Sequence, residues 1–122
     1  MSAYSILIVD DDVQFGRYVK RSMSGMGHIV EQISRSREIF ERYDVFAPDF
    51  IFLDIFMPDF DGIEVSNWLS EKRFNGMLEL MSGFDPAYLT AARVFAQRRS
   101  SATVATLEKP ARAQKIRELL LA

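Results

Sequence analysis

Short apolar runs alternate along this chain with longer amphipathic segments, an order that is typical of βα units built around a parallel sheet. The runs are rich in β-branched and aromatic residues, and three of the five are almost wholly apolar. Strands that are apolar on both faces belong inside a sheet that helices cover on each side. Five strands are therefore predicted, at residues 6–9, 29–33, 50–53, 77–81 and 102–107.

The segments between these runs carry apolar residues at helical spacing. In the first segment, Phe15, Val19 and Met23 recur at this spacing and would face a core. In the fourth, Asp85 followed by Pro86 is a suitable N-cap and first-turn pair. Five helices are predicted, at residues 13–26, 36–46, 62–74, 86–98 and 110–121.

Composition restricts the kinds of protein that this chain can be. Its 122 residues are 48% hydrophobic and 26% charged, as expected of one globular domain with a buried core. The absence of cysteine excludes disulfides and thiolate chemistry, and a single histidine excludes a multi-histidine zinc site. No run approaches the roughly 18 apolar residues of a membrane span. Residues 1–5 also lack the layout of a signal peptide, so we expect a cytoplasmic protein without membrane contact.

Charge is unevenly distributed, although the formal net charge is only −2. Residues 91–122 hold 7 basic and 2 acidic side chains, whereas residues 1–90 hold 8 basic and 15 acidic ones. A basic surface over residues 85–122 is suited to an acidic partner, but most such surfaces are simply solvated. We do not expect nucleic-acid binding from this chain alone.

Polar side chains follow four of the five predicted strands, at the edge of the sheet where open α/β folds bind their ligands. Three consecutive acids follow the first strand, and helix capping accounts for one of them but not for three. The residues at these strand ends are Asp10, Asp11, Asp12, Asp54, Ser82 and Lys109.

Convergence of Asp10, Asp11 and Asp54 would require a compensating positive charge. At about 4 to 5 Å and an effective dielectric constant of about 20, each pair of carboxylates repels by roughly 4 kcal/mol. Mg²⁺ suits a site with few carboxylates, because it keeps several waters and takes a phosphate oxygen as a further ligand. Lys109 can pair with Asp54 or with a phosphoryl group on it, and Ser82 can donate to a phosphoryl oxygen.

Four motifs stand at these strand ends in order: DDD, LDIFMPDFDG around Asp54, LMSG and EKP. Together they resemble the receiver domain of two-component response regulators (the CheY-like superfamily), over essentially the whole chain. The resemblance implies an α/β, flavodoxin-like (βα)5 fold with a doubly wound five-stranded parallel sheet, and one receiver domain over residues 1–122. It also implies a signalling switch in which Asp54 accepts a phosphoryl group from a histidine kinase or a histidine phosphotransfer protein.

The resemblance assigns a metal site position by position. It implies that Mg²⁺ binds Asp11, Asp54 and the backbone carbonyl of Phe56, with Asp10 assisting through water. Three further positions match the loops of the family, one of them directly after Lys109. These loop residues are Pro58, Gly62 and Pro110.

On the phosphoryl side, the resemblance implies that Ser82 and Lys109 hold the phosphoryl oxygens. The family usually has Tyr or Phe three residues before the lysine, where this chain has Thr106. We therefore expect output to use the backbone of the loop after Ser82 or a smaller side chain. Phe56 and Phe84 are unusually bulky for positions that flank the phosphoryl group. We predict that they exclude an in-line water and make phosphorylated Asp54 long-lived.

Two other kinds of protein share parts of this pattern. An aspartate-nucleophile phosphatase of the haloacid dehalogenase type needs an acid two residues after its nucleophile, where this chain has Phe56, so turnover lacks a proton donor. A flavodoxin-like flavin binder needs a Ser/Thr/Gly-rich loop after the first strand, and three aspartates would repel its phosphate. We expect a regulatory phosphoacceptor and not an enzyme.

The partners are only partly specified by the sequence. In the family, the first helix, here with Phe15 and Tyr18, meets the histidine phosphodonor. The usual output face corresponds to residues 85–122, and it would meet a downstream protein or a second copy of the chain in a homodimer. The chain is either a stand-alone regulator or the receiver of a larger DNA-binding transcriptional regulator, and we favour the first.

Overall fold

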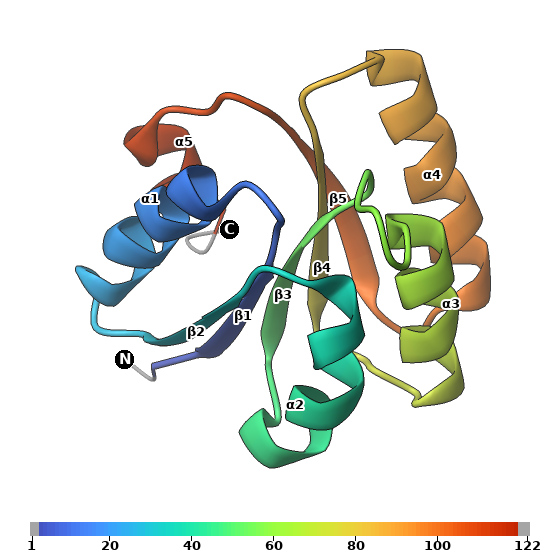
Figure 1. The fold of residues 1–122 in the computed structure, drawn as a ribbon, viewed down its shortest axis with the longest axis horizontal. Helices are drawn as coiled ribbons and strands as arrows, with labels where there is room; N and C mark the ends of the chain where they lie inside the picture. Colours follow the sequence, from blue (N-terminus) through green and yellow to red (C-terminus); the bar gives the residue numbers. More distant parts are fainter. Residues whose placement is uncertain (1–2, 120–122) are drawn as a thin grey trace.

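The five predicted strands form one parallel sheet in the order β2-β1-β3-β4-β5 (Figure 1). The computed structural model describes residues 3–119. The strands are β1 (Ser5–Val9), β2 (Ile29–Ile33), β3 (Phe50–Asp54), β4 (Met77–Ser82) and β5 (Thr103–Glu108). Each strand lies within one residue of its predicted bounds, and the topology is the flavodoxin-like, doubly wound arrangement that was predicted.

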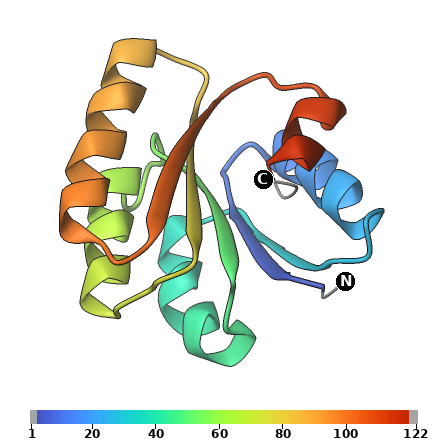
Figure 2. The same ribbon diagram turned by 180° about the vertical axis from the view of Figure 1, so that it is seen from behind.

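Helices cover both faces of the sheet (Figures 1 and 2). One face carries α1 (Val13–Ser24) and α5 (Ala113–Glu118). The other face carries the 3-10 turn η1 (Ser36–Glu38) and the helices α2 (Ile39–Phe46), α3 (Gly62–Glu71) and α4 (Pro86–Arg99). Because β1 pairs with both β2 and β3, the winding of the chain reverses between β1 and β3. Open sheets bind ligands at the carboxyl ends of strands at such a point.

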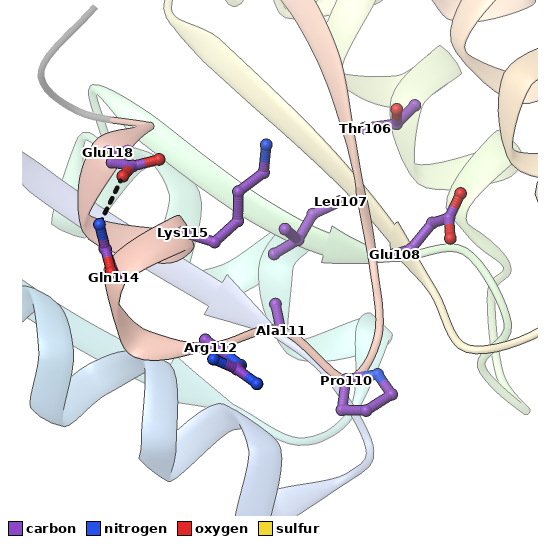
Figure 3. Close-up of a pocket in the computed structure, with 9 residues that line it drawn as sticks. All are labelled: Thr106, Leu107, Glu108, Pro110, Ala111, Arg112, Gln114, Lys115 and Glu118. Atoms are coloured by element: carbon purple, nitrogen blue, oxygen red, sulfur yellow. Dashed lines mark hydrogen bonds between the residues drawn. The ribbon is translucent and has the colours of Figure 1, made fainter.

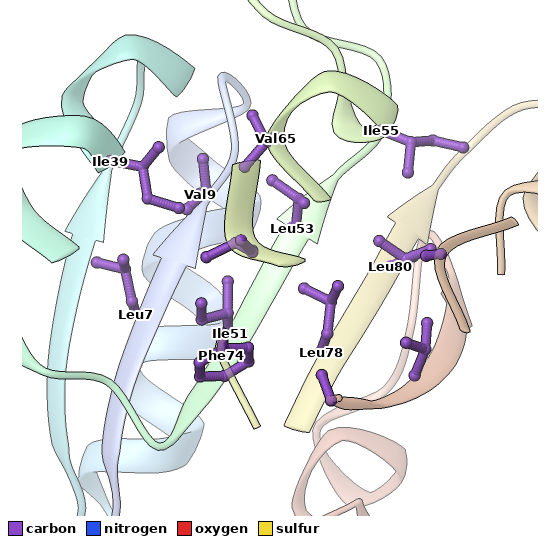
Figure 4. Packing of buried hydrophobic residues seen from close by; sticks show 14 of the residues in the cluster. Leu7, Val9, Ile39, Ile51, Leu53, Ile55, Val65, Phe74, Leu78 and Leu80 are labelled. Carbon is purple, nitrogen blue, oxygen red and sulfur yellow. The ribbon is translucent and has the colours of Figure 1, made fainter. Parts of the chain in front are cut away.

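Each face of the sheet has its own hydrophobic core. The larger core packs α2, α3 and α4 on the sheet and includes Leu7, Ile39, Ile51, Val65 and Leu78 (Figure 4). The smaller core packs α1 and α5 on the opposite face and includes Ile8, Val19, Met23, Phe52 and Ile116. All five residues of β3 are buried, so the strand that ends in Asp54 lies in the interior.

Two predicted helices were too long at their C-terminal ends. α1 ends at Ser24, because the backbone turns toward β2 through Gly27, whose φ is 90°. α3 ends at Glu71, and Arg73 adopts a left-handed conformation with a φ of 60°. Left-handed residues end helices, since they cannot continue the right-handed backbone.

Two predicted helices begin later than expected. The second starts as the 3-10 turn η1 and becomes regular only in α2. The fifth begins at Ala113, because the Lys109 amide donates to the Ser82 carbonyl at 2.8 Å and the backbone of Arg112 is extended. Its predicted end at residue 121 lies outside the described residues. Within residues 3–119, no helix is both long and apolar enough to cross a membrane.

Candidate functional site

The carboxyl ends of β1 and β3 bring three acids together. Asp10, Asp11 and Asp54 each present a carboxylate oxygen within 4.8 Å of the others. Asp10 and Asp54 are buried, whereas Asp11 is exposed. A donor set with two buried carboxylates and one that faces solvent fits a hard divalent cation that keeps part of its water shell.

The third acid of the DDD motif has a different role. Asp12 is the N-cap of α1, and its Oδ1 accepts a hydrogen bond from the Phe15 amide at 3.1 Å. The Asp12 amide donates in turn to Asp10 Oδ1 at 2.9 Å, which fixes the orientation of that carboxylate. The capping interpretation therefore holds for Asp12, and it leaves Asp10 and Asp11 for the site.

Asp54 ends β3 and is only 5% exposed. Burial raises the pKa of Asp54 to about 7, and the negative charge of Asp10 adds to this rise. The Phe56 amide, which donates to Asp54 Oδ1 at 3.1 Å, and the positive charge of Lys109 both oppose it. Any further positive charge beside Asp54 would therefore stabilise its ionised form.

Lys109 lies between the two buried acids. Its Nζ donates to Asp10 Oδ2 at 2.9 Å and to Asp54 Oδ2 at 3.4 Å, and it also lies 5.0 Å from the centroid of the Phe15 ring. Burial alone would lower the pKa of Lys109, but the hydrogen bond and charge of Asp10, together with Asp54, raise it overall. The sequence predicted a pair with Asp54, and the structure adds Asp10 as the closer partner.

Ser82 ends β4 beside this group and is buried. Its Oγ accepts a hydrogen bond from the Phe84 amide at 3.0 Å, so the hydroxyl hydrogen can donate to another group. Its carbonyl accepts from the Lys109 amide, which joins the ends of β4 and β5.

Thr106 lies on the face of β5 that is opposite to α5. It is in register with Leu80, which belongs to the larger core. Figure 3 shows Thr106 and Glu108 pointing away from Leu107 and Lys115. All four help to line a cavity of about 550 Å³ beside β5 and α5, so the assignment of Thr106 to a face rests on its register with Leu80. Thr106 thus faces the side of the sheet that carries α4.

Phe56 and Phe84 lie together at the mouth of the acidic site. Their rings meet edge to face with centroids 5.2 Å apart, and they line a cavity of about 560 Å³ with Asp54 and Lys109. The two side chains are 38% and 72% exposed, so neither folds into the core. Sequence reasoning missed Tyr88, whose ring lies 5.0 Å from that of Phe56. Its signal was an aromatic residue in the first turn of the helix that follows the Ser82 loop.

The loop positions have separate structural roles. Gly62 opens α3 against Ile55, and a Cβ built on Gly62 would lie 2.5 Å from the Ile55 Cα, so the close approach requires glycine. Pro58 is exposed on the loop between β3 and α3. Pro110 follows Lys109 through a cis peptide bond and is also exposed. The role of the Phe56 carbonyl as a metal ligand stays a prediction.

Comparisons with known proteins agree with this geometry. Residues 6–120 match the family described as "Response regulator receiver domain". The photosynthetic apparatus regulatory protein RegA of Rhodobacter capsulatus is 31% identical over 121 residues, which cover 97% of this chain and 61% of RegA. Response regulator MprA of Mycolicibacterium vanbaalenii is 39% identical over 64 residues, which cover 52% of this chain and 28% of MprA. The matches thus cover about a quarter to three fifths of these relatives.

A solved structure shares the fold over nearly the whole chain. The CheY-like response regulator receiver domain protein from Methanospirillum hungatei superposes with a TM-score of 0.84 at 22% identity. The superposition covers 98% of this chain and 92% of that one. At this identity, the likeness shows the fold and not the chemistry.

Proposed function

Because the chain belongs to the response regulator receiver domain family of two-component signalling, we propose that it is a phosphorylation-dependent switch with Asp54 as its phosphoacceptor. The position of Asp54 is the observation that carries the proposal. Its carboxylate ends a wholly buried strand, beside Asp10 and within reach of Lys109. A buried acid with a raised pKa and a specific charged partner in a crevice is typical of a functional site.

The proposed reaction is a transfer of a phosphoryl group between two nucleophiles. A carboxylate oxygen of Asp54 forms a bond to phosphorus while the bond from phosphorus to the donor's histidine nitrogen breaks, and the nitrogen keeps the electron pair. Such a transition state is assisted chiefly by positioning and by positive charge near the three equatorial oxygens. Lys109 supplies that charge from its place beside Asp54, and the Ser82 hydroxyl donates a hydrogen bond.

The acids of the crevice are proposed to hold Mg²⁺. Asp11 and Asp54 would bind it directly with the Phe56 backbone carbonyl, and Asp10 would assist through water. The ion supplies positive charge that offsets both the clustered carboxylates and the phosphoryl oxygens. This chain's own residues orient the site. Hydrogen bonds from the Asp12 and Phe56 backbone amides hold the Asp10 and Asp54 carboxylates in place before any ligand binds.

The partners follow from the family and from the two surfaces beside the site. We propose a histidine kinase or a histidine phosphotransfer protein as donor, docking near α1, where Tyr18 is exposed beside the partly buried Phe15. The basic surface over residues 85–122 is proposed to meet an acidic downstream protein or a second copy of the chain, with affinity changed by phosphorylation. We further propose a cytoplasmic regulator that is one receiver domain over residues 1–122 and is not an enzyme.

A second candidate is the receiver of a larger DNA-binding transcriptional regulator. The matched residues cover only 61% of RegA and 28% of MprA, and this observation favours it. The phosphorylation chemistry at Asp54 would be the same in both cases.

The test measures intact mass after incubation with acetyl phosphate, with and without Mg²⁺. Wild type is expected to gain one phosphoryl group of about 80 Da only when Mg²⁺ is present. Asp54→Asn is expected to gain none, while Asp59→Asn, at an exposed acid on the loop after β3, is expected to match wild type. Equal uptake by wild type and Asp54→Asn would refute the assignment.

A further inference from the structure

Three aromatic side chains connect the loop that follows Asp54 with α4. Phe56 follows β3, Phe84 follows β4, and Tyr88 lies in the first turn of α4. The Phe56 and Phe84 rings are 5.2 Å apart at an interplanar angle of 82°, and the Phe56 and Tyr88 rings are 5.0 Å apart at 31°. Both distances are those of direct aromatic contact. The three rings therefore form one continuous cluster across two loops and a helix.

One end of this cluster is tied to the site itself. The Phe56 amide donates to Asp54 Oδ1 at 3.1 Å, and the Phe84 amide donates to Ser82 Oγ at 3.0 Å. A phosphoryl group on Asp54 changes what its carboxylate can accept, and a Ser82 hydroxyl that turns toward that group pulls on the Phe84 amide. Each of these two residues is thus joined by one backbone hydrogen bond to a side chain that must respond to phosphorylation, Phe56 to Asp54 and Phe84 to Ser82.

The other end of the cluster belongs to α4. Asp85 Oδ1 accepts a hydrogen bond from the Ala87 amide at 2.9 Å, so the turn that carries Tyr88 is capped and moves with the helix. α4 buries Leu89 together with the small Ala92 and Ala96, so two of its three buried side chains are small. Small side chains interdigitate little, and a helix packed through them can shift by sliding.

The Phe84 ring also has room to move. It is 72% exposed, whereas a ring packed inside a core would be held in one position. On this side of the sheet β5, which also packs beside α4, presents Thr106 between Val104 and Glu108, and none of the three side chains is aromatic. The rings therefore provide a continuous side-chain contact between the acceptor and the helix that Thr106 does not.

We propose that Phe56, Phe84 and Tyr88 carry the phosphorylation signal from Asp54 to α4. This inference rests on the proposed function and specifies how the same site is coupled to the surface beyond it. Phosphorylation shifts the population of ring arrangements, and Tyr88 transfers that shift to the first turn of α4. Tyr88 is a positioning residue, because it is not among the residues that line the cavity over Asp54 and acts through its contact with Phe56.

The test measures hydrogen–deuterium exchange in peptides covering α4, before and after phosphorylation with acetyl phosphate and Mg²⁺. Intact mass gives the phosphorylated fraction of each sample. Wild type is expected to change its exchange in α4, and Tyr88→Ala to lose at least half of that change at the same phosphorylated fraction. Tyr88→Phe keeps the ring and is expected to keep the response. Val94→Ala is the matched control, since Val94 on the same helix is 39% exposed against 41% for Tyr88.

The outcomes separate this inference from the proposed function. A phosphorylated Tyr88→Ala protein with the full wild-type change in α4 would overturn the inference and leave the function standing. A phosphorylated wild type whose α4 does not respond would also overturn it. A wild type that gains no phosphoryl group removes the proposed function and the inference with it. Phe84→Ala, at a mostly exposed ring, is expected to weaken the response in the same way and replaces Tyr88→Ala if that variant folds poorly.

Discussion

Lys109 shows how single residues prepare the site before any ligand is bound. Its ammonium group contacts Asp10 at 2.9 Å and Asp54 at 3.4 Å, so one cation already offsets two buried carboxylates. A buried acid left without such a partner would be strongly destabilising. If Asp54 is phosphorylated as proposed, Lys109 can meet a phosphoryl oxygen there while it keeps its shorter contact with Asp10.

We predict that two neighbouring side chains set the lifetime of a phosphoryl group on Asp54. Phe56 and Phe84 line the cavity over the carboxylate. We expect their apolar rings to occupy space that an attacking water would need. We predict that the double variant Phe56→Asn, Phe84→Ala loses its phosphoryl group on the order of ten times faster than wild type. Decay of the phosphorylated mass after removal of acetyl phosphate gives the rate.

The matched variant for this experiment is Phe56→Leu, which keeps an apolar side chain at the same position. It is expected to retain most of the wild-type lifetime. If the double variant decays at the wild-type rate, the rings do not protect the acyl phosphate, and the lifetime is set elsewhere in the site.

Glu79 is a second buried acid, and the proposed function does not use it. It lies in the middle of β4 with no exposed surface, and within the part of the chain that the structure describes neither of its carboxylate oxygens has a hydrogen-bond partner. Burial raises the pKa of Glu79 from 4.5 to about 7, and the positive charge of Lys115 opposes this only in part. Folding therefore favours the protonated form of Glu79. The resulting contribution to the stability of the folded protein is fully present below about pH 4.5.

This preference predicts a pH-dependent stability difference between wild type and Glu79→Gln. The stability from protonated Glu79 is lost as the pH rises from about 4.5 to about 7, whereas glutamine does not titrate. Between pH 5 and pH 8, Glu79→Gln should gain on the order of 2 to 3 kcal/mol relative to wild type in urea unfolding. Asp54 titrates in the same range in both proteins, so the difference between them isolates Glu79.

The control for this prediction is Glu41→Gln, because Glu41 is an exposed acid on α2. Its unfolding free energy is expected to follow the wild-type pH profile. A Glu79→Gln protein that also runs parallel to wild type from pH 5 to pH 8 would show that Glu79 is charged in the folded protein at little cost.

At the scale of secondary-structure elements, strands were easier to predict than helix ends. Strand bounds follow from short apolar runs, which burial inside the sheet enforces. Helix ends depend on single backbone conformations such as that of Gly27, and on contacts between distant segments. The late start of α5 reflects the hydrogen bond from the Lys109 amide to the Ser82 carbonyl, which extends the pairing beyond β5. No periodicity in the sequence signals that bond.

The site was predictable where its residues stand at strand ends, and less so where loops meet. Parallel strands bring their carboxyl ends to one edge, so the convergence of Asp10, Asp11 and Asp54 followed from order alone. The packing of Tyr88 on Phe56 required the relative placement of α4 and the loop after β3. Likewise, the Phe60 amide donates to Ser36 Oγ at 2.9 Å across 24 residues of sequence. This hydrogen bond anchors the loop between β3 and α3 to η1.

For the whole molecule, the acidic crevice lies at the end of a well-packed sheet. The cores on both faces fix β1 and β3, so the buried Asp10 and Asp54 cannot move apart to relieve their repulsion. Their mutual repulsion is reduced by Lys109 but not removed, and it lowers the stability of the folded protein in the absence of a metal. A cation that binds only the folded protein should therefore stabilise it by mass action.

We predict that Mg²⁺ raises the free energy of unfolding of wild type by about 1.4 kcal/mol when it stands at ten times its dissociation constant. Asp11 and Asp12 provide a matched pair, since both are exposed neighbours but Asp12 caps α1. Asp11→Asn should lose most of the Mg²⁺ effect in urea unfolding. Asp12→Asn should keep it, because asparagine is an equally good N-cap. An equal loss in both variants would mean that Mg²⁺ responds to the general negative charge of this edge and not to a site built on Asp11.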